Sequence, residues 1–138
     1  MGIVREHCST RGAPVLPRLV HVDIGPTKEW GYPDGEARRD DWRSYHERIW
    51  ADPEASRADF YLVDGRFRVA CFAQVLLHAA PDALIAIHDF ANRPDYHVVH
   101  DVAREVARTE NLSVFLRRRD YDPRRALAIL EEHALVPA

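Results

Sequence analysis

Two short apolar runs, each followed by a carboxylate, constrain the fold of this chain more than any other feature. The first run, residues 60–63, leads into Asp64, and the second, residues 84–87, leads into His88 and Asp89. An apolar stripe at helical spacing lies between them. Apolar runs of strand length on either side of an amphipathic helix are typical of a βαβ unit, whose parallel strands are buried on both faces. The sequence therefore predicts an α/β fold: a partial Rossmann-like, mostly parallel sheet with flanking helices.

Helical spacing of apolar residues places three helices in the C-terminal two thirds of the chain. The inward positions of the first are Val69, Phe72, Ala73, Leu76 and Leu77. A second helix, capped by Asp95, has its stripe at Val99, Val102, Ala103 and Val106. A third begins at Asp122-Pro123 and turns inward Ala126, Leu127, Leu130 and Ala134. Spacing of three and four residues is that of one helix face, so each stripe is expected to pack on the sheet.

The remaining segments are predicted from shorter patterns. Residues 19–22 and 112–116 are strand candidates, and residues 40–50, which carry two tryptophans, have near-helical apolar spacing. Residues 28–35, which lie between the first strand candidate and the near-helical segment, are rich in turn formers and aromatic residues and are expected to form a loop. We expect residues 1–18 to be an irregular leader and residues 19–138 to be one domain.

Composition excludes several classes of protein. The 138 residues are 46% hydrophobic and 30% charged, which is ordinary globular usage for one domain. No apolar run approaches the ~20 residues of a spanning helix, and the first ten residues lack the apolar stretch of a signal peptide, so a cytoplasmic location is expected. A formal net charge of −3 gives no electrostatic reason for nucleic-acid binding. A small-molecule substrate is the expected ligand.

Asp64 and Asp89 are predicted to stand together, because neighbouring parallel strands present their carboxyl ends at one edge, where open sheets bind ligands. Two carboxylates there suit Mg²⁺, which prefers oxygen ligands. His88 has a reference pKa suited to a general base, and with Asp89 it forms the predicted catalytic pair. The alternative interpretation is that both aspartates only cap the turns that follow them.

Basic and aromatic side chains are expected over the same edge. Arg66, Arg93, Tyr96 and Trp30 are the predicted substrate-binding residues, since arginines capture carboxylate or phosphate through charge-assisted hydrogen bonds. Arg68 and His97 lie in the same segments, and for these two we favour surface ion pairs. For Trp30, an aromatic wall over a substrate and simple burial of the loop are both open.

The segment Val63-Asp64-Gly65-Arg66-Phe67-Arg68, followed by a helix and then Ile87-His88-Asp89-Phe90, resembles the fourth- and fifth-strand region of class I S-adenosylmethionine-dependent methyltransferases. Residues 21–27 would then match the third-strand region. The resemblance implies S-adenosylmethionine as cofactor and O-methyl transfer to a small or saccharide-like acceptor. It covers about residues 19 to 120.

The chain departs from this family in its cofactor half. Its glycines form no glycine-rich turn between a strand and a helix; they are Gly2, Gly12, Gly25, Gly31, Gly35 and Gly65. The resemblance thus describes a truncated domain that lacks the first two strands, and the residues that would bind the cofactor are unknown. A catalytically inactive remnant that serves as a binding or assembly module is the alternative function.

The missing strands have a physical consequence for residues 60–63. In the family the first strand pairs with this segment, so its loss leaves an edge with unpaired backbone groups. We expect the chain to form a homodimer, to exchange segments, to bind a partner along Phe60–Val63, or to place its own residues 19–22 in the gap.

Overall fold

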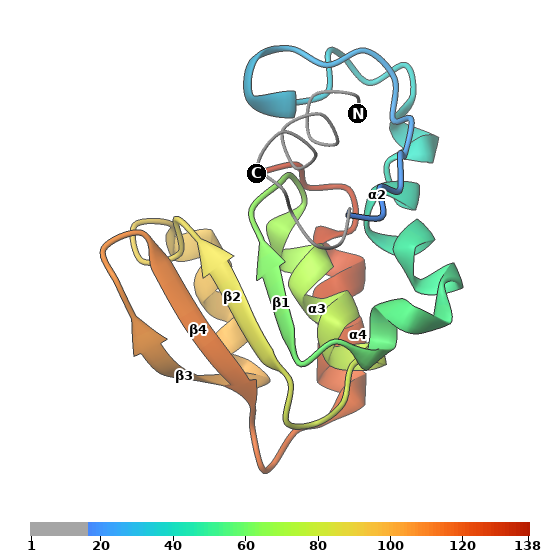
Figure 1. Cartoon of the computed structure of the whole chain (residues 1–138). Helices are drawn as coiled ribbons and strands as arrows, with labels where there is room; N and C mark the ends of the chain where they lie inside the picture. Colours follow the sequence, from blue (N-terminus) through green and yellow to red (C-terminus); the bar gives the residue numbers. More distant parts are fainter. Residues whose placement is uncertain (1–16) are drawn as a thin grey trace, which may run out of the picture.

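The structure, a computed structural model, describes residues 17–138. Its centre is a four-stranded sheet in the order β1-β2-β4-β3 (Figure 1). The strands are β1 (Phe60–Val63), β2 (Leu84–His88), β3 (Ala103–Arg108) and β4 (Leu112–Arg117). The α-helices are α2 (Ser44–Glu47), α3 (Arg68–His78) and α4 (Pro123–His133). The 3₁₀ helices are η1 (Glu29–Gly31), η2 (Arg39–Asp41), η3 (Arg48–Ala51), η4 (Pro53–Arg57) and η5 (Pro94–Asp101).

The sheet is mixed: three of its four strands run in one direction, as expected, but only the β1–β2 pair is parallel. β1 and β2 pair in parallel, from Phe60 opposite Leu84 to Val63 opposite Ile87. β4 is antiparallel to both β2 and β3, so β1, β2 and β3 run in one direction and β4 alone is reversed. The expected βαβ unit is therefore present as β1, α3 and β2, and its strands end together at one edge of the sheet.

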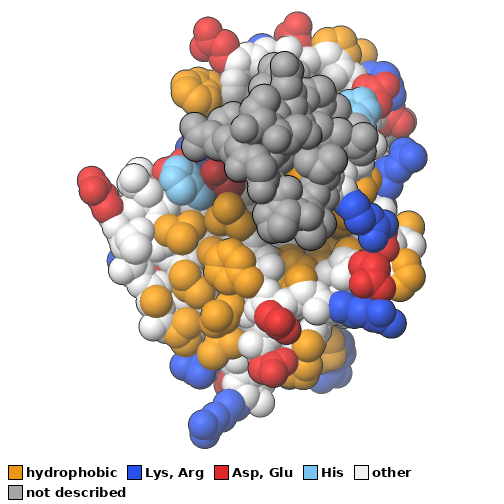
Figure 2. All heavy atoms as spheres, in the orientation of Figure 1, with side chains coloured by type: hydrophobic (Ala, Val, Ile, Leu, Met, Phe, Trp, Pro, Cys, Tyr) orange, Lys and Arg blue, Asp and Glu red, His pale blue; other side chains and the backbone are white. Residues whose placement is uncertain are grey.

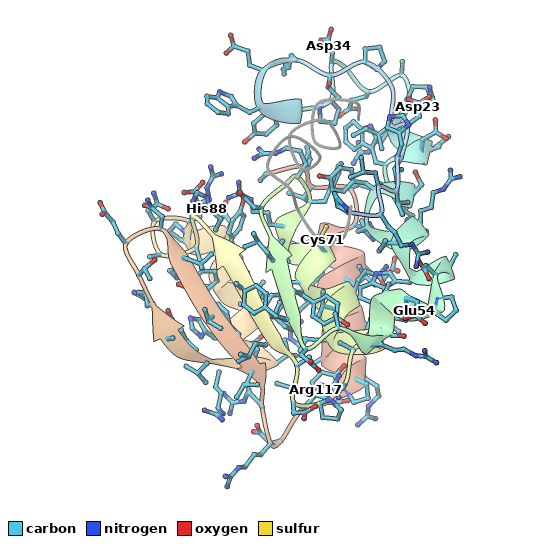
Figure 3. The ribbon with its side chains drawn as sticks, viewed as in Figure 1. Asp23, Asp34, Glu54, Cys71, His88 and Arg117 are labelled. Carbon is cyan, nitrogen blue, oxygen red and sulfur yellow. The ribbon has the colours of Figure 1, made fainter. Side chains whose placement is uncertain are left out.

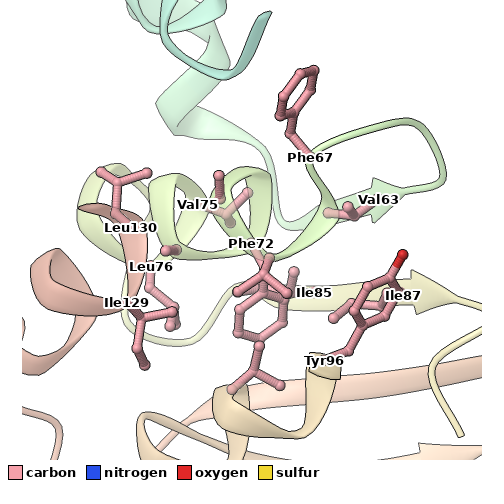
Figure 4. Packing of buried hydrophobic residues seen from close by; sticks show 14 of the residues in the cluster. Val63, Phe67, Phe72, Val75, Leu76, Ile85, Ile87, Tyr96, Ile129 and Leu130 are labelled. Carbon is pink, nitrogen blue, oxygen red and sulfur yellow. The ribbon is translucent and has the colours of Figure 1, made fainter. Parts of the chain in front are cut away.

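The core lies between the sheet and the helices on one of its faces. Phe72 on α3 meets Phe115 on β4 edge to face, with ring centroids 5.5 Å apart, and Ile85 lies beside them (Figure 4). Four of the five predicted inward positions of α3 are buried, and Leu77 is half-buried. On α4 the prediction fails at Leu127, which is 50% exposed, because Ile129 occupies the inward position instead. None of the helices within residues 17–138 is both long and apolar enough to cross a membrane.

The helix predicted from Asp95 through Val106 is wrong in its second half. Helix η5 ends at Asp101, and Ala103–Arg108 is strand β3, paired with β4 across a tight turn. Val99 stays in η5, whereas Val106, the last residue of the predicted stripe, is β-branched and loses little freedom in a strand. Pairing with β4 gives the backbone of this segment its hydrogen bonds, and a bulge between Glu105 and Ala107 absorbs the irregular register.

Two N-terminal predictions also differ from the structure. Residues 19–22 form no strand and do not pair with β1, although residues 20–22 line a cavity with Leu62, and among residues 17–138 β1 pairs with β2 alone. Residues 40–50 are helical but divided among η2, α2 and η3. The predicted leader falls almost wholly outside the described residues, which begin at Pro17.

The expectation that both faces of the sheet are buried is wrong. Helices α3, α4 and η5 lie on one face, and the other carries a group of apolar side chains over β1, β2 and β4 (Figures 1 and 2). Phe60 and Leu62 of β1 are 51% and 58% exposed. A parallel strand is enclosed only where crossover helices cover both sides, and within residues 17–138 they cover one.

Candidate functional site

Arg68 joins the carboxyl ends of β1 and β2. It is the first residue of α3, its side chain is 4% exposed, and its Nε donates to the carbonyl oxygen of Gly65 at 2.9 Å. Its Nη1 donates to the carbonyl oxygen of His88 at 2.9 Å and to Asp89 Oδ2 at 3.3 Å. Its Nη2 lies 3.5 Å from Asp64 Oδ1. The surface ion pair expected for Arg68 is therefore wrong: this guanidinium holds two strand ends and two carboxylates in place.

His88 and Asp89 lie on the same side of the strand end because the chain turns between them. Asp89 has φ 56°, which ends the alternation of β2 and brings its carboxylate back toward the preceding residue. His88 Nδ1 lies 3.2 Å from Asp64 Oδ1 and 3.3 Å from Asp89 Oδ1. Figure 3 shows His88 at the end of the sheet opposite to Arg117. The predicted trio Asp64, His88 and Asp89 is therefore one cluster.

The charges around Asp89 keep it ionised. Burial by itself raises the pKa of this carboxyl, but the Arg68 hydrogen bond and the positive charges of His88 and Arg93 outweigh it, so the pKa is lowered from its usual value. Asp89 and Asp64 thus both have the same cation, Arg68, as their partner.

The two carboxylates do not fit the predicted Mg²⁺ site. Arg68 already lies between Asp64 and Asp89 and supplies the positive charge that a metal ion would bring. Within residues 17–138 no group of three or more His, Cys, Asp or Glu side chains is arranged to hold a metal ion. We therefore find no support for a metal at Asp64 and Asp89.

Arg66 is the least satisfied polar side chain of the site. The residue is 7% exposed, and its Nε and Nη1 are buried without a hydrogen-bond acceptor. Its guanidinium lies over the ring of Tyr32, with Cζ 4.2 Å from the ring centroid. Among residues 17–138 no carboxylate pairs with it. Arg66 is therefore held in position by an aromatic face, with its Nε and Nη1 donors unused.

Arg93 stands beside Arg66 across the same hollow. Its guanidinium lies 5.5 Å from the ring centroid of Tyr96 and close to the Tyr32 hydroxyl, whose pKa it lowers from the usual value. The Tyr96 hydroxyl is buried and, like Arg66, lacks a hydrogen-bond partner. The hollow is a cavity of about 310 Å³, lined by Trp30, Tyr32, Arg66, Arg68, Asp89 and Arg93. Trp30 is 84% exposed at its rim.

The turn between β1 and α3 is shaped by an aromatic group from the N-terminal segment. The backbone N–H of Arg66 donates to the Tyr45 hydroxyl at 3.1 Å, and a Cβ on Gly65 would overlap that hydroxyl. Phe67 follows with φ 53° and a fully buried ring, 5.3 Å from that of Tyr45. Glycine is thus needed at position 65 for close approach of Tyr45, and the turn fixes where Arg66 and Arg68 point.

The structure brings together nearly every residue that the sequence nominated. The catalytic pair His88 and Asp89, the carboxylate Asp64, and the predicted substrate-binding residues lie at one edge; these last are Arg66, Arg93, Tyr96 and Trp30. Sequence reasoning missed Tyr32, which reaches the site from the distant N-terminal loop and has no pattern that marks it. It also misplaced Arg68, although its spacing of four residues from Asp64 was visible. His97 is exposed, as expected.

Comparison with known proteins gives the fold a precedent. A crystal structure of a methyltransferase-like protein from Silicibacter pomeroyi DSS-3 is similar to this chain, with a TM-score of 0.78 over 99% of this chain and 73% of that one, at 24% sequence identity. Neither a protein-family model nor a curated protein sequence matches the chain. The domain therefore has a methyltransferase-like fold.

Proposed function

We propose that this methyltransferase-like domain is a binding module for a small molecule that carries an oxyanion, a carboxylate or a phosphate, and that Arg66 and Arg93 bind the oxyanion. The observation that carries the proposal is the buried guanidinium of Arg66, whose Nε and Nη1 have no acceptor. A buried charge without a partner is costly to a fold. An anion in the adjoining cavity supplies the missing acceptors.

The geometry around Arg66 suits recognition of a planar or tetrahedral oxyanion. A guanidinium presents its donors as a rigid fork that matches two oxygens at once. Stacking on Tyr32 fixes the plane of that fork before any ligand arrives, which lowers the entropy lost on binding. Arg93 adds a second cation, and a cavity of about 310 Å³ limits the ligand to a small molecule.

The carboxylates of the site do not cancel the charge of Arg66. Asp64 and Asp89 pair with Arg68, and Asp89 also interacts with the charge of Arg93. Arg66 thus keeps its charge for a ligand, with Arg93, the aspartates and His88 beside it. A ligand held by its oxyanion would present its other polar groups, such as hydroxyls, toward this cluster.

The described residues provide no glycine-rich turn for S-adenosylmethionine. Methyltransferases of this kind need such a turn so that backbone approaches the cofactor, and Gly65, two residues after β1, is the one described glycine that closely follows a strand. The space next to Gly65 is taken by the Tyr45 hydroxyl, which binds the Arg66 N–H. We therefore infer that this chain alone binds no S-adenosylmethionine and that methyl transfer would require a cofactor-binding part from another polypeptide.

One observation favours O-methyl transfer as a second function, in combination with such a part. His88 Nδ1 lies within 3.3 Å of oxygens of both Asp64 and Asp89, without a hydrogen bond to either, so the imidazole stands beside two carboxylates at the strand ends. A histidine at such a place is suited to act as a general base toward a hydroxyl. The acceptor would then be a small or saccharide-like molecule with both a hydroxyl and an oxyanion.

Calorimetric titration of the folded chain with inorganic phosphate, and separately with benzoate, tests the proposed binding. We expect saturable binding of at least one of them, in the range of about 0.1 to 1 mM that a few charge-assisted hydrogen bonds support. Arg66→Gln should weaken it at least about tenfold. S-adenosylmethionine, titrated in the same way, should give no saturable heat.

Arg57→Gln is the matched control, because Arg57 is an exposed arginine on η4 that pairs with Glu54. It should bind the anion as the unmodified chain does. Equal affinities of the Arg66→Gln variant and the unmodified chain would contradict the proposal. A failure of both phosphate and benzoate to bind would contradict it too. Saturable binding of S-adenosylmethionine would overturn the inference about the cofactor.

A further inference from the structure

The open face of the sheet is apolar over three of its four strands, β1, β2 and β4, while the edge strand β3 presents the exposed Arg104 beside Leu116. Because side chains alternate along a strand, the residues next to the buried Ile85 and Phe115 point to the side without helices. Phe60, Leu62 and Leu84 on this side are exposed, and Val114 and Leu116 are half-buried. Figure 2 views the molecule toward this side and shows apolar side chains side by side there. We call the following set the open-face patch: Phe60, Leu62, Leu84, Val114 and Leu116. Ala86 points to the same side and is buried among them.

This patch is as large as the apolar part of a stable protein interface. Its side chains expose an apolar area on the order of 400 Å², which is within the range of the largest patches on monomeric proteins. A stable interface buries about 800 Å² on each partner, of which a little over half is apolar. The open-face patch with a polar rim around it therefore matches one side of a dimer interface of ordinary size.

The register of the sheet makes one row of the open face complementary to itself, whereas the neighbouring row ends in Arg104 opposite Leu116 and so has its charge at the rim. One row runs across the four strands as Leu62, Ala86, Val114 and Ala107, which is large, small, medium and small. A two-fold axis parallel to the strands and between β2 and β4 would place β1 over the β3 of a second copy and β2 over its β4. Leu62 then faces an alanine, and Ala86 faces a valine. Large residues opposite small ones are what lets two layers interdigitate.

We propose that the open-face patch is the interface of a symmetric homodimer, in which the sheets of two copies of this chain pack face to face. The interface is isologous, since each copy contributes the same surface. Sheets packed in this way lie about 10 Å apart and enclose the side chains of both inner faces. The second copy thus covers the face that the helices of this chain leave open.

Edge pairing is the competing arrangement, and the observations favour face packing over it. An antiparallel pairing of β1 with the β1 of a second copy would join only four residues on each side, Phe60–Val63. It would leave Leu84, Val114 and Leu116 of both copies in water. Face packing removes the whole patch from water, and the gain from apolar burial is proportional to the area removed.

Sedimentation velocity over a concentration series tests the proposal. We expect the unmodified chain to change from monomer to dimer between about 1 and about 100 µM, a range that brackets a dissociation constant near ~10 µM. Leu62→Arg should raise that constant at least about tenfold, because a charge would then be buried in an apolar interface. Phe60→Arg is a second variant of the same patch and should act in the same direction.

Leu127→Arg is the matched control: Leu127 is 50% exposed on α4, on the helix side of the molecule, so its substitution should change the constant less than about twofold. Circular dichroism establishes that each variant is folded. A chain that stays monomeric throughout the series overturns the proposal. So does a dimer that forms as readily with both patch substitutions, or one that Leu127→Arg weakens as much as the patch substitutions do.

Hydrogen exchange separates the two dimers. In a face-packed dimer the amides of β1 that point away from β2 still exchange rapidly, whereas an edge-paired dimer protects them. Protection of these amides on dimerisation would overturn face packing in favour of strand pairing.

Discussion

On the helix side of the sheet, Ile85 and Phe115 are buried beneath α3, whereas Leu62 and Leu84, on the opposite side of the same sheet, are exposed. The two faces have equally apolar residues, so composition does not distinguish them. What differs is the covering: α3, α4 and η5 all lie on one side (Figure 1). A strand that is apolar on both faces is expected to be covered on both faces. The described residues cover one face of this sheet.

The sharpest way to break this comparison is to remove one phenylalanine from each face. Phe72→Ala on the covered face should lower the free energy of unfolding by about 4 kcal/mol, because Phe72 is fully buried and leaves a cavity. Phe60→Ala on the open face should lower it by less than about 1 kcal/mol in dilute solution. Urea unfolding of both variants measures the difference, and equal losses would show that the open face is covered.

Arg68 lies at the end of the sheet, where its side chain joins the ends of β1 and β2, and it tests how much the stability of this end depends on one buried side chain. Arg68→Met should lower the free energy of unfolding by about 3 kcal/mol, since two carboxylates and two carbonyl oxygens lose their donor. Arg57→Met, at an exposed arginine, should change it by no more than about 0.5 kcal/mol. A small effect at Arg68 would mean that the strand ends hold together without it.

Arg66 should behave in the opposite way to Arg68, although both are buried arginines of the same turn. Arg66 has no carboxylate partner, so Arg66→Met should leave the free energy of unfolding unchanged or raise it by about 1 kcal/mol in the absence of anions. The same substitution should abolish stabilisation by phosphate. Thermal unfolding with and without phosphate measures both effects, and a large loss of stability without phosphate would identify Arg66 as structural.

His46, on the covered side of the sheet, should make the free energy of unfolding depend on pH. Burial lowers the pKa of His46, whose ring lies against Gln74 of α3 and the carbonyl oxygen of Ala134. Its folded pKa is therefore below the unfolded value near ~6.5, and its contribution to stability is complete above that pH and decreases as pH falls through it. His46→Gln should flatten the stability profile below about pH 6.5. His97→Gln, at an exposed histidine, should not.

The sequence predicted the part of the site that depends on strand ends. Asp64, His88 and Asp89 each follow a clear apolar run, and the βαβ pattern places both runs in parallel, so their meeting follows from topology. Tyr32 was out of reach because its position depends on how a long loop folds over the sheet. Arg68 was misjudged because an arginine at the start of a helix is usually exposed, and its burial depends on two carboxylates that arrive from different strands.

The same contrast explains the errors in the fold. Ala103 and Val106 fit both a helical stripe and an irregular strand, and only the pairing of β3 with β4 decides between them. Residues 19–22 have the composition of a strand but no strand in the structure, since local propensity does not provide a pairing partner. The open face was not predicted. Apolar residues on both sides of β1 indicate which side chains are suited to burial, but they do not show whether any element covers them.

The Nε–H resonance of Arg66 gives the most direct test of an oxyanion site. The folded chain, labelled with ¹⁵N, is titrated with inorganic phosphate and followed by nuclear magnetic resonance. We expect a saturable downfield shift of the Arg66 Nε proton as its unused donor acquires an acceptor, with the Arg57 resonance unmoved. An Arg66 resonance that does not move, or that moves only in parallel with Arg57, would contradict the proposed binding of an anion at this site.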